Sequence, residues 1–163
     1  MIDSDVILGA NVTIFDENLV NIFGCTIDEN CFIGPFVEIT RGVHIMRDCK
    51  IESHSFICTG VTIERGVFIG HGVMFTNDSY PRTDRQVVHP ETRIKEFASI
   101  GSGATILGGV TIGRHSVVGA GSVVTKNVPD LAIGAGNPCR IIRQFGSESE
   151  LLEYIHHRQE TQQ

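Results

Sequence analysis

Three groups of residues in this chain have the types and spacing to form a functional site. Two histidines, His54 and His71, carry imidazoles that could accept a proton from a nucleophile. Two glycine-containing triplets further along would leave the backbone uncovered, as a long ligand bound to main-chain groups requires: Gly101-Ser102-Gly103 and Gly119-Ala120-Gly121. Beyond them lie three basic side chains that could contact a phosphorylated tail: Lys126, Arg140 and Arg143.

The composition limits the kind of scaffold that could position these groups. The chain has 163 residues, of which 41% are apolar and 20% charged, so we expect one folded domain and neither a disordered nor a membrane-inserted protein. The first residues show no basic region followed by an apolar stretch, so no signal peptide is expected. The net charge of −6 argues against nucleic acid and anionic membranes as general partners.

The cysteines point to a reducing compartment. Their number is odd and no Cys-x-x-Cys pair occurs, so a zinc ribbon or a disulfide scaffold is not expected: Cys25, Cys31, Cys49, Cys58 and Cys139. Reduced thiols in the cytoplasm are the better interpretation. Glycine is in excess, with 18 residues, and composition alone does not explain it.

A six-residue repeat explains the excess of glycine. Aliphatic or aromatic residues recur at this spacing in three stretches: Ile2, Leu8, Ile14 and Val20; Ile27, Ile33, Ile39, Ile45, Ile51, Ile57, Ile63, Ile69 and Phe75; and Ile94, Ile100, Ile106, Ile112, Val118 and Val124. A small residue follows four places later in most repeats, and glycine often follows the aliphatic residue directly. An α-helix would scatter this set around its axis, because six steps rotate it by about 600°.

Short strands separated by sharp corners fit the repeat. Three repeats form one triangular coil, with the aliphatic side chains inside and glycine supplying the unusual backbone angles of the corners. Stacked coils satisfy one another's backbone groups. The sequence therefore predicts an all-β fold, a left-handed parallel β-helix over residues 1–130.

Two segments depart from the repeat. Residues 76–93 are predicted to leave the prism as an ordered external loop. Residues 131–163 form a C-terminal extension, in which Ser147-x-x-Glu150 resembles a capping box that opens a short helix. Leu151, Leu152 and Ile155 are expected on one face of this helix, which would cover the last coil.

The coil length places the candidate residues relative to one another. Because Ile51 and Ile69 are one coil apart, His54 and His71 should occupy the same corner on neighbouring coils. The two glycine-containing triplets should continue that corner as a strip of bare backbone amides. We treat His44, His115, His156 and His157 as solvated residues, whereas His89, in the external loop, could have either a structural or a functional role.

The sequence resembles the hexapeptide-repeat acyltransferases, and within them the nucleotide-sugar 3-amino N-acetyltransferases of bacterial surface-polysaccharide pathways. The resemblance rests on residues 33–39, on residues 49–58 and above all on residues 70–82, which read Gly-His-Gly-Val-Met-Phe-Thr-Asn-Asp-Ser-Tyr-Pro-Arg. Residues 104–130 and Gly136-Asn137-Pro138 resemble the acetyl-CoA end of the wider family.

The resemblance implies a homotrimer whose active site lies between two subunits, with acetyl-CoA along the prism and a UDP- or dTDP-linked amino sugar near the loop. It implies that Asn77, with His54 and more weakly His71, serves the reaction, and that six residues bind the sugar nucleotide: Glu38, His54, Asn77, Asp78, Tyr80 and Arg82. The cofactor would be held by Gly101, Ser102, Gly103, Gly119, Ala120, Lys126, Arg140 and Arg143. The loop is shorter than the subgroup's, which leaves the sugar open.

Three alternatives remain at this point. The protein could acetylate a sugar or serine hydroxyl, which would need a histidine base more than an amine does. It could bind zinc, although the His-x-x-x-x-His pattern of β-helical carbonic anhydrases does not occur, and no metal is expected. It could also be a non-catalytic scaffold, which the ordered loop argues against.

Overall fold

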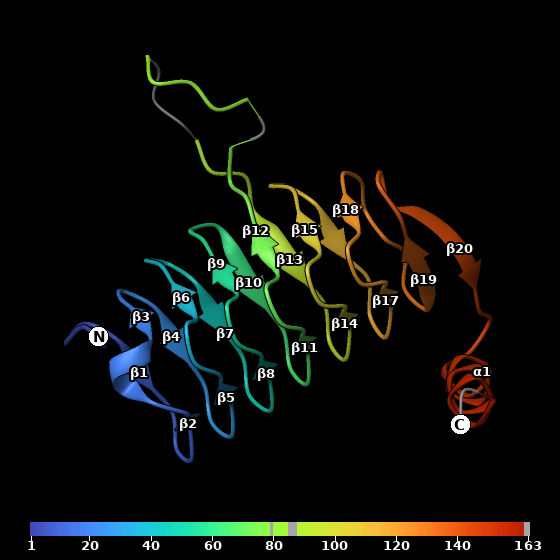
Figure 1. Cartoon of the computed structure of the whole chain (residues 1–163), viewed down its shortest axis with the longest axis horizontal. Helices are drawn as coiled ribbons and strands as arrows, with labels where there is room; N and C mark the ends of the chain where they lie inside the picture. Colours follow the sequence, from blue (N-terminus) through green and yellow to red (C-terminus); the bar gives the residue numbers. More distant parts are fainter. Residues whose placement is uncertain (79, 85–87, 162–163) are drawn as a thin grey trace.

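The computed structural model describes residues 1–78, 80–84 and 88–161 and shows an elongated prism of short parallel strands (Figure 1). The first sheet contains β1 (Ile7–Leu8), β4 (Thr26–Ile27), β7 (His44–Ile45), β10 (Val61–Ile63), β13 (Thr92–Ile94) and β16 (Thr111–Ile112). The second contains β2 (Thr13–Ile14), β5 (Phe32–Ile33), β8 (Lys50–Ile51), β11 (Phe68–Ile69), β14 (Ser99–Ile100), β17 (Val117–Val118), β19 (Ala132–Ala135) and β20 (Arg140–Gln144). The third contains β3 (Asn21–Ile22), β6 (Glu38–Ile39), β9 (Phe56–Ile57), β12 (Met74–Phe75), β15 (Thr105–Ile106) and β18 (Val123–Val124).

The register confirms the predicted coil. Ile27 pairs with Ile45, and Ile45 pairs with Ile63, so successive coils of the first sheet align in steps of three repeats. Ile63 then pairs with Ile94 across the loop, and Ile94 with Ile112. The predicted parallel β-helix is therefore confirmed.

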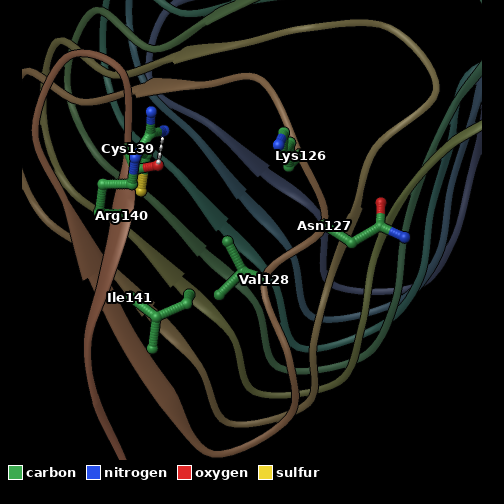
Figure 2. A pocket seen from close by; sticks show the side chains of 6 residues that line it. All are labelled: Lys126, Asn127, Val128, Cys139, Arg140 and Ile141. Carbon is green, nitrogen blue, oxygen red and sulfur yellow. Dashed lines mark hydrogen bonds between the residues drawn. The ribbon is translucent and has the colours of Figure 1, made fainter.

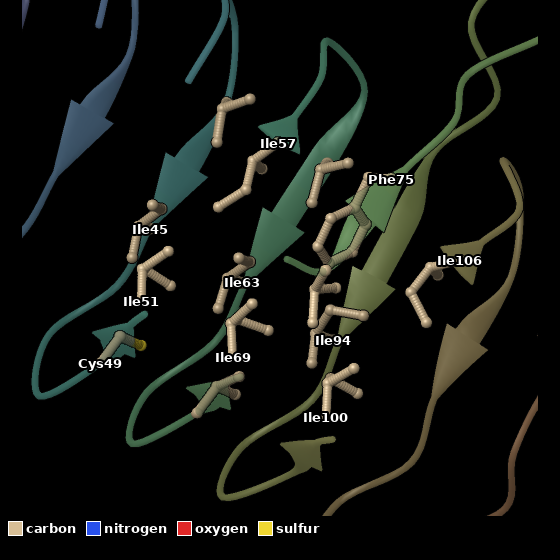
Figure 3. Close-up of a cluster of buried hydrophobic side chains, with 14 of the residues drawn as sticks. Ile45, Cys49, Ile51, Ile57, Ile63, Ile69, Phe75, Ile94, Ile100 and Ile106 are labelled. Atoms are coloured by element: carbon tan, nitrogen blue, oxygen red, sulfur yellow. The ribbon is translucent and has the colours of Figure 1, made fainter. Parts of the chain in front are cut away.

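The repeated aliphatic residues fill the interior of the prism (Figure 3). From Ile27 to Val124 every member of the repeat is almost fully buried, and the ring of Phe75 packs among the isoleucines. From Cys31 to Val128 the small position of each repeat is also buried. The serines at this position satisfy their hydroxyls with backbone groups, as Ser55 does by donating to the carbonyl of Gly70.

The N-terminal part of the repeat differs from the prediction. Ile22, and not Val20, takes the position in the third sheet, where it pairs with Ile39. A short 3-10 helix, η1 (Glu17–Leu19), adds residues before this strand, and the turn after Ile22 is correspondingly shorter. Leu8 remains 42% exposed, because the first coil is covered on one side only.

The glycines serve two distinct purposes at the corners, of which only the unusual backbone angle was predicted from the sequence. Gly70 directly follows the aliphatic residue, and a Cβ there would lie 2.7 Å from the backbone nitrogen of Ser102 on the next coil. Gly72, two residues later, has a φ of +64° and open space around it. Close approach of the next coil explains the first glycine, and the left-handed backbone explains the second.

The loop leaves the prism between β12 and β13 and projects away from it (Figure 1). It is two residues shorter than predicted, because Thr92 and Arg93 already pair with β10. Residues 79 and 85–87 of the predicted loop lie outside the described residues.

The C-terminal extension adds a strand pair and a helix. β19 continues the parallel ladder beside β17, and β20 then runs antiparallel to β19. The helix α1 (Glu148–Glu160) begins at Ser147, whose Oγ accepts from the N–H of Glu150, while the Glu150 carboxylate accepts from the N–H of Gly146. Leu151 is buried but Leu152 is 44% exposed, since successive helical residues point about 100° apart. The predicted capping box is confirmed, whereas Leu152 does not share the buried face of Leu151. The last two residues of the extension lie outside the described range.

Candidate active site

The turns of the prism form three edges, and most candidate residues lie on two of them, whereas Glu38 lies in β6 and Arg140 and Arg143 lie in β20. The histidine edge joins the second sheet to the third and contains the turns of His54 and His71. The loop edge joins the third sheet to the first and contains Thr59, Asn77 and the base of the loop. The predicted alignment of the two histidines on neighbouring coils is present, since Ile51 pairs with Ile69 just before them.

His71 is held by partners at both ring nitrogens. Its Nδ1 lies 2.9 Å from the hydroxyl of Ser53, and its Nε2 lies 3.8 Å from a carboxylate oxygen of Glu52. Glu52 also pairs with Lys50 at 2.8 Å. The backbone N–H of His71 donates to Ser102 Oγ, so the imidazole is fixed against the histidine edge.

His54 packs against an aromatic ring instead, at an interplanar angle of 37°. Its imidazole centroid lies 4.7 Å from the ring centroid of Phe36, on the preceding coil. Both residues have left-handed backbone, with φ of 62° for His54 and 59° for Phe36. The same left-handed backbone recurs at other corner residues of the prism, such as Phe97 and His115, so it belongs to the turns of the fold.

Phe36 also borders a surface cavity, which is lined in part by the predicted substrate residue Glu38. This cavity has a volume of about 370 Å³ and is lined by Asn18, Leu19, Val20, Asn21, Phe36, Val37 and Glu38. It combines one exposed aromatic ring with apolar side chains and a polar rim. A flat, partly polar group would fit such a surface.

The glycine-containing turns of the histidine edge, at Gly72, Gly103 and Gly121, form a surface that side chains leave open. Their backbone amides are nevertheless hydrogen-bonded. Side chains built at Gly72, Gly103 or Gly121 would meet nothing within 4 Å. Their N–H groups nevertheless donate to the carbonyls of Ser53, His71 and Ser102, each at 2.8 Å. Bare surface is therefore present as predicted, whereas these three amides already serve the ladder between coils. The predicted cofactor residues Gly101, Ser102, Gly103, Gly119 and Ala120 all lie on this edge.

The side chain of Asn77 is held by a hydrogen bond at the base of the loop. Its Nδ2 donates to the backbone carbonyl of Thr59 at 3.3 Å, which fixes the orientation of the carboxamide and leaves Oδ1 as the acceptor atom. On the returning side, His89 Nδ1 lies 3.5 Å from the backbone carbonyl of Asn77. Pro90 packs so closely on Gly108 that a Cβ there would lie 3.0 Å from the proline ring. Both ends of the loop are thus fixed to the loop edge.

The remaining predicted substrate residues lie further out on the loop. Arg82 and Asp84 form a bidentate pair at 2.8 and 2.6 Å, which raises the pKa of Arg82 and lowers that of Asp84. The Tyr80 side chain is exposed, and the Tyr80 N–H donates to the Asp78 carboxylate at 2.9 Å.

A basic cavity lies at the C-terminal end of the prism (Figure 2). It has a volume of about 240 Å³ and is lined by Lys126, Asn127, Val128, Cys139, Arg140 and Ile141. Lys126 lies on the loop edge two coils beyond Asn77, a separation of about 10 Å at the spacing of stacked strands.

Arg143 does not join this cavity. Its guanidinium stacks over the rings of Phe145 and Tyr154, at 5.1 and 4.6 Å from their centroids. Lys126 and Arg140 are therefore brought together as expected, and Arg143 serves the C-terminal packing instead.

Comparison with known proteins supports the resemblance stated above. The model "Bacterial transferase hexapeptide (six repeats)" matches residues 91–126, and "Hexapeptide repeat of succinyl-transferase" matches residues 24–57. The galactoside O-acetyltransferase of Lactococcus lactis is 34% identical over 142 residues, covering 80% of this chain and 67% of that protein. The chain belongs to the hexapeptide-repeat acyltransferases. The galactoside O-acetyltransferase of Escherichia coli is 32% identical over 143 residues, covering 82% and 70%.

A solved acetyltransferase resembles this hexapeptide-repeat acyltransferase in structure as well. The Vibrio cholerae protein VCA0836, solved with acetyl coenzyme A, is 28% identical with a TM-score of 0.54, and the match covers 77% of this chain and 73% of that one. In the part of the chain that the structure describes, no group of three His, Cys, Asp or Glu side chains is placed to hold a metal ion. No described helix is long and apolar enough to cross a membrane.

Several residues around the site of this hexapeptide-repeat acyltransferase were not candidates in the sequence. Phe36, Glu52 and Ser53 were missed, although coil arithmetic places Phe36 one coil before His54. Thr59 likewise lies one coil before Asn77. The positions 18 residues before His54, His71 and Asn77 are Phe36, Ser53 and Thr59, so the coil length identifies these three contacts, but not the contact of Glu52 with His71.

Proposed function

We propose that this protein transfers the acetyl group of acetyl-CoA to the amino group of a UDP- or dTDP-linked 3-amino sugar used in surface-polysaccharide synthesis. The observation that carries this proposal is the pinned carboxamide of Asn77. An uncharged amine is nucleophilic without losing a proton, so it needs mainly an acceptor that orients one N–H. Asn77 Oδ1 can provide that acceptor, and orientation of two bound substrates supplies much of the rate.

The basic cavity supports acetyl-CoA as the donor. Lys126 and Arg140 supply positive charge at the C-terminal end, and their phosphate ligands would be the charged part of the cofactor. The two coils between Lys126 and Asn77 leave room for an extended chain that reaches the acceptor with its thioester. The open strip at Ser102 and Gly103 lies on the histidine edge, so a second chain would have to offer it as the other wall, without side chains in the way.

The separation of the two edges supports a homotrimer. Asn77 belongs to the loop edge, while His54 and His71 belong to the histidine edge. One chain therefore does not bring these groups together, and a site that uses both needs the histidine edge of a second chain opposite the loop edge of the first. The cavity beside Glu38 and Phe36, with His54 above it, would then receive the nucleotide, and Arg82 its phosphates.

Acetyl transfer to a hydroxyl is the second candidate function. Both curated relatives described above are named galactoside O-acetyltransferases. A galactoside hydroxyl is a weaker nucleophile than an amine, so this reaction would depend more strongly on a histidine base. Either reaction would take place in the cytoplasm, consistent with five free cysteines.

Release of free thiol from acetyl-CoA tests these functions. The purified protein is incubated with UDP- and dTDP-linked amino sugars, with galactosides and with serine, and the product is identified by mass spectrometry. We expect turnover only with an amino sugar nucleotide. Turnover with a galactoside alone would show that the acceptor is a hydroxyl and not an amine. Failure to bind acetyl-CoA in calorimetry would overturn both proposed functions. Light scattering of the same sample tests the trimer.

A further inference from the structure

The N-terminal end of the prism leaves part of the core uncovered. Leu8 and Ile14 belong to the inward-facing repeat and pair with Ile27 and Ile33 of the next coil. Both partners are fully buried, whereas Leu8 is 42% exposed and Ile14 is half-buried. At the opposite end, β19, β20 and α1 follow the last coils (Figure 1). Further large apolar side chains are exposed at the uncovered end: Met1, Ile7 and Phe15. An exposed apolar surface of this kind indicates an interaction site.

The same end presents the backbone of two edge strands. β1 and β2 are the terminal strands of the first and second sheets, so each has a neighbouring strand on one side only in the described structure. The N–H groups of Thr13 and Phe15 donate to carbonyls of the next coil, at 2.8 and 2.9 Å. Since successive N–H groups of a strand point in opposite directions, the N–H of Ile14 points to the open side. Such an edge can accept a further strand.

The charge of this end has one sign. Residues 1–40 contain seven of the 19 acidic residues of the chain and none of its 13 lysines and arginines. Asp5 pairs with Arg41 at 3.2 Å, and Asp28 lies 3.1 Å from the ring of His44. The other five form no ion pair in the part of the chain that the structure describes: Asp3, Asp16, Glu17, Glu29 and Glu38. Asp16 and Glu17 come directly after β2, so acidic charge lies beside the open edge.

We propose that the N-terminal end of the prism binds a partner protein through an extended segment in which apolar and basic residues alternate. The segment adds to β2 as a further strand and pairs with the N–H of Ile14. Because alternate side chains of a strand point to opposite faces, one set covers Leu8 and Ile14 while the basic set reaches Asp16 and Glu17. A second copy of this chain is a poor occupant, since two such ends would bring like charges together.

A short synthetic peptide of alternating valine and lysine tests this surface on the intact protein. We expect it to bind in calorimetry with a Kd that rises as salt is added, because the contact is charged. A peptide of alternating valine and glutamate should not bind. A valine–lysine peptide that is methylated on its backbone nitrogens should bind more weakly, because it cannot donate to the strand edge. Hydrogen exchange of the Ile14 amide should slow when the unmethylated peptide is bound.

Four substitutions locate the binding surface. Phe15→Ser should raise the Kd of the valine–lysine peptide about tenfold, since an apolar contact is lost. Glu17→Lys should raise it about fivefold, since an attraction becomes a repulsion. Ile142→Ser and Glu153→Lys make the same changes at exposed positions of the opposite end and should leave the Kd unchanged. Thermal midpoints equal to that of wild type show that the variants are folded.

Several results would overturn the proposal. Equal binding of the lysine and glutamate peptides, no binding of either, or a Kd that Phe15→Ser and Glu17→Lys leave unchanged would each do so. Slowed exchange in β20 in place of Ile14 would put the strand at the other edge of the second sheet. Light scattering without peptide that shows growth of the assembly with concentration, abolished by Phe15→Ser, would make a second copy the occupant. No varied residue belongs to the proposed active site, so this inference and the proposed function fail separately.

Discussion

The imidazole of His54 lies over the ring of Phe36, with centroids 4.7 Å apart, because both residues occupy the same left-handed position of successive coils. The same position of the next coil holds Gly72, whose surroundings are open. The period of the fold thus places an aromatic pair directly beside bare backbone. A flat group could stack on the pair while a thin chain follows the strip.

Replacing His54 by alanine should weaken binding of the sugar nucleotide more than it slows the chemical step. We expect KM for this substrate to rise about tenfold, the equivalent of about 1.4 kcal/mol, while kcat falls by less than threefold. Steady-state kinetics with the amino sugar nucleotide measure both values. A loss confined to kcat would instead make His54 the base.

Removing the carboxamide of Asn77 should reduce acetyl transfer without unfolding the protein. We expect Asn77→Ala to lower kcat/KM by about 100-fold, since the acceptor loses its orienting partner. Asn77→Asp keeps an acceptor oxygen but cannot donate to the Thr59 carbonyl. If the orientation of the side chain matters, the activity of this variant should lie between those of wild type and Asn77→Ala. Equal activity of wild type and Asn77→Ala would rule out the assigned role.

Arg140 and Arg143 should behave differently although both are close in sequence. Arg140→Ala should raise the Kd for acetyl-CoA about tenfold, since a charge-assisted phosphate contact is lost. Arg143→Ala should leave this Kd unchanged and lower the thermal midpoint, because its guanidinium packs on Phe145 and Tyr154. Calorimetry and thermal unfolding distinguish the two effects. The reverse result would place the phosphates near α1.

Two alanine substitutions separate the two purposes of corner glycines. Gly70→Ala should cost about 3 kcal/mol, since the added Cβ meets the backbone of Ser102. Gly72→Ala has open space and should cost only about 1 kcal/mol for the left-handed backbone. Thermal midpoints at one fixed protein concentration provide the comparison. Equal destabilisation would contradict the distinction.

Asp130 should contribute stability that depends on pH. The N–H of Arg114 donates to its carboxylate at 2.8 Å, and Lys95 Nζ lies 3.3 Å away, which lower the pKa of Asp130. Its contribution is therefore present above the unfolded pKa of about 3.9 and is lost as the pH falls through the lower folded pKa. Because the side chain is 46% exposed, Asp130→Asn should cost only about 1 kcal/mol at pH 7.

The difference between wild type and Asp130→Asn should shrink as the pH falls below the unfolded pKa of about 3.9 and through the lower folded pKa, because the wild-type carboxylate then becomes protonated as well. Chemical unfolding at a series of pH values measures this convergence. Stability curves that stay parallel throughout this acidic range would show that the charge of Asp130 has no part in the effect.

The interior of the prism was predictable because its repeat is enforced by packing. Each repeated aliphatic residue from Ile27 to Val124 fills an equivalent place in the interior of the prism. The six-residue spacing therefore identifies both the strands and the core. The shift from Val20 to Ile22 was not predictable, because a 3-10 helix at Glu17–Leu19 changes the residue count without disturbing the aliphatic pattern.

The site was predictable only where the 18-residue length of one coil determines the position of a residue. This length places His54 and His71 on one edge, but it does not specify which side chains they contact, such as Ser53 and Glu52 for His71. The position of Arg143 depends on how α1 packs, which no repeat encodes. The contact between His89 and Asn77 depends on the return path of the loop, whose length alone does not specify where it closes.

The reversal of the chain at β20 bears on how copies of this protein could assemble. A parallel ladder can be extended indefinitely, because each coil offers the next the same row of backbone donors and acceptors. On the second sheet β20 ends that row with a strand of opposite polarity, so another molecule cannot continue this sheet in parallel from this end. End-to-end stacking of prisms through this sheet is thereby disfavoured, and the flanks of the prism remain for association, where a closed ring of subunits can form.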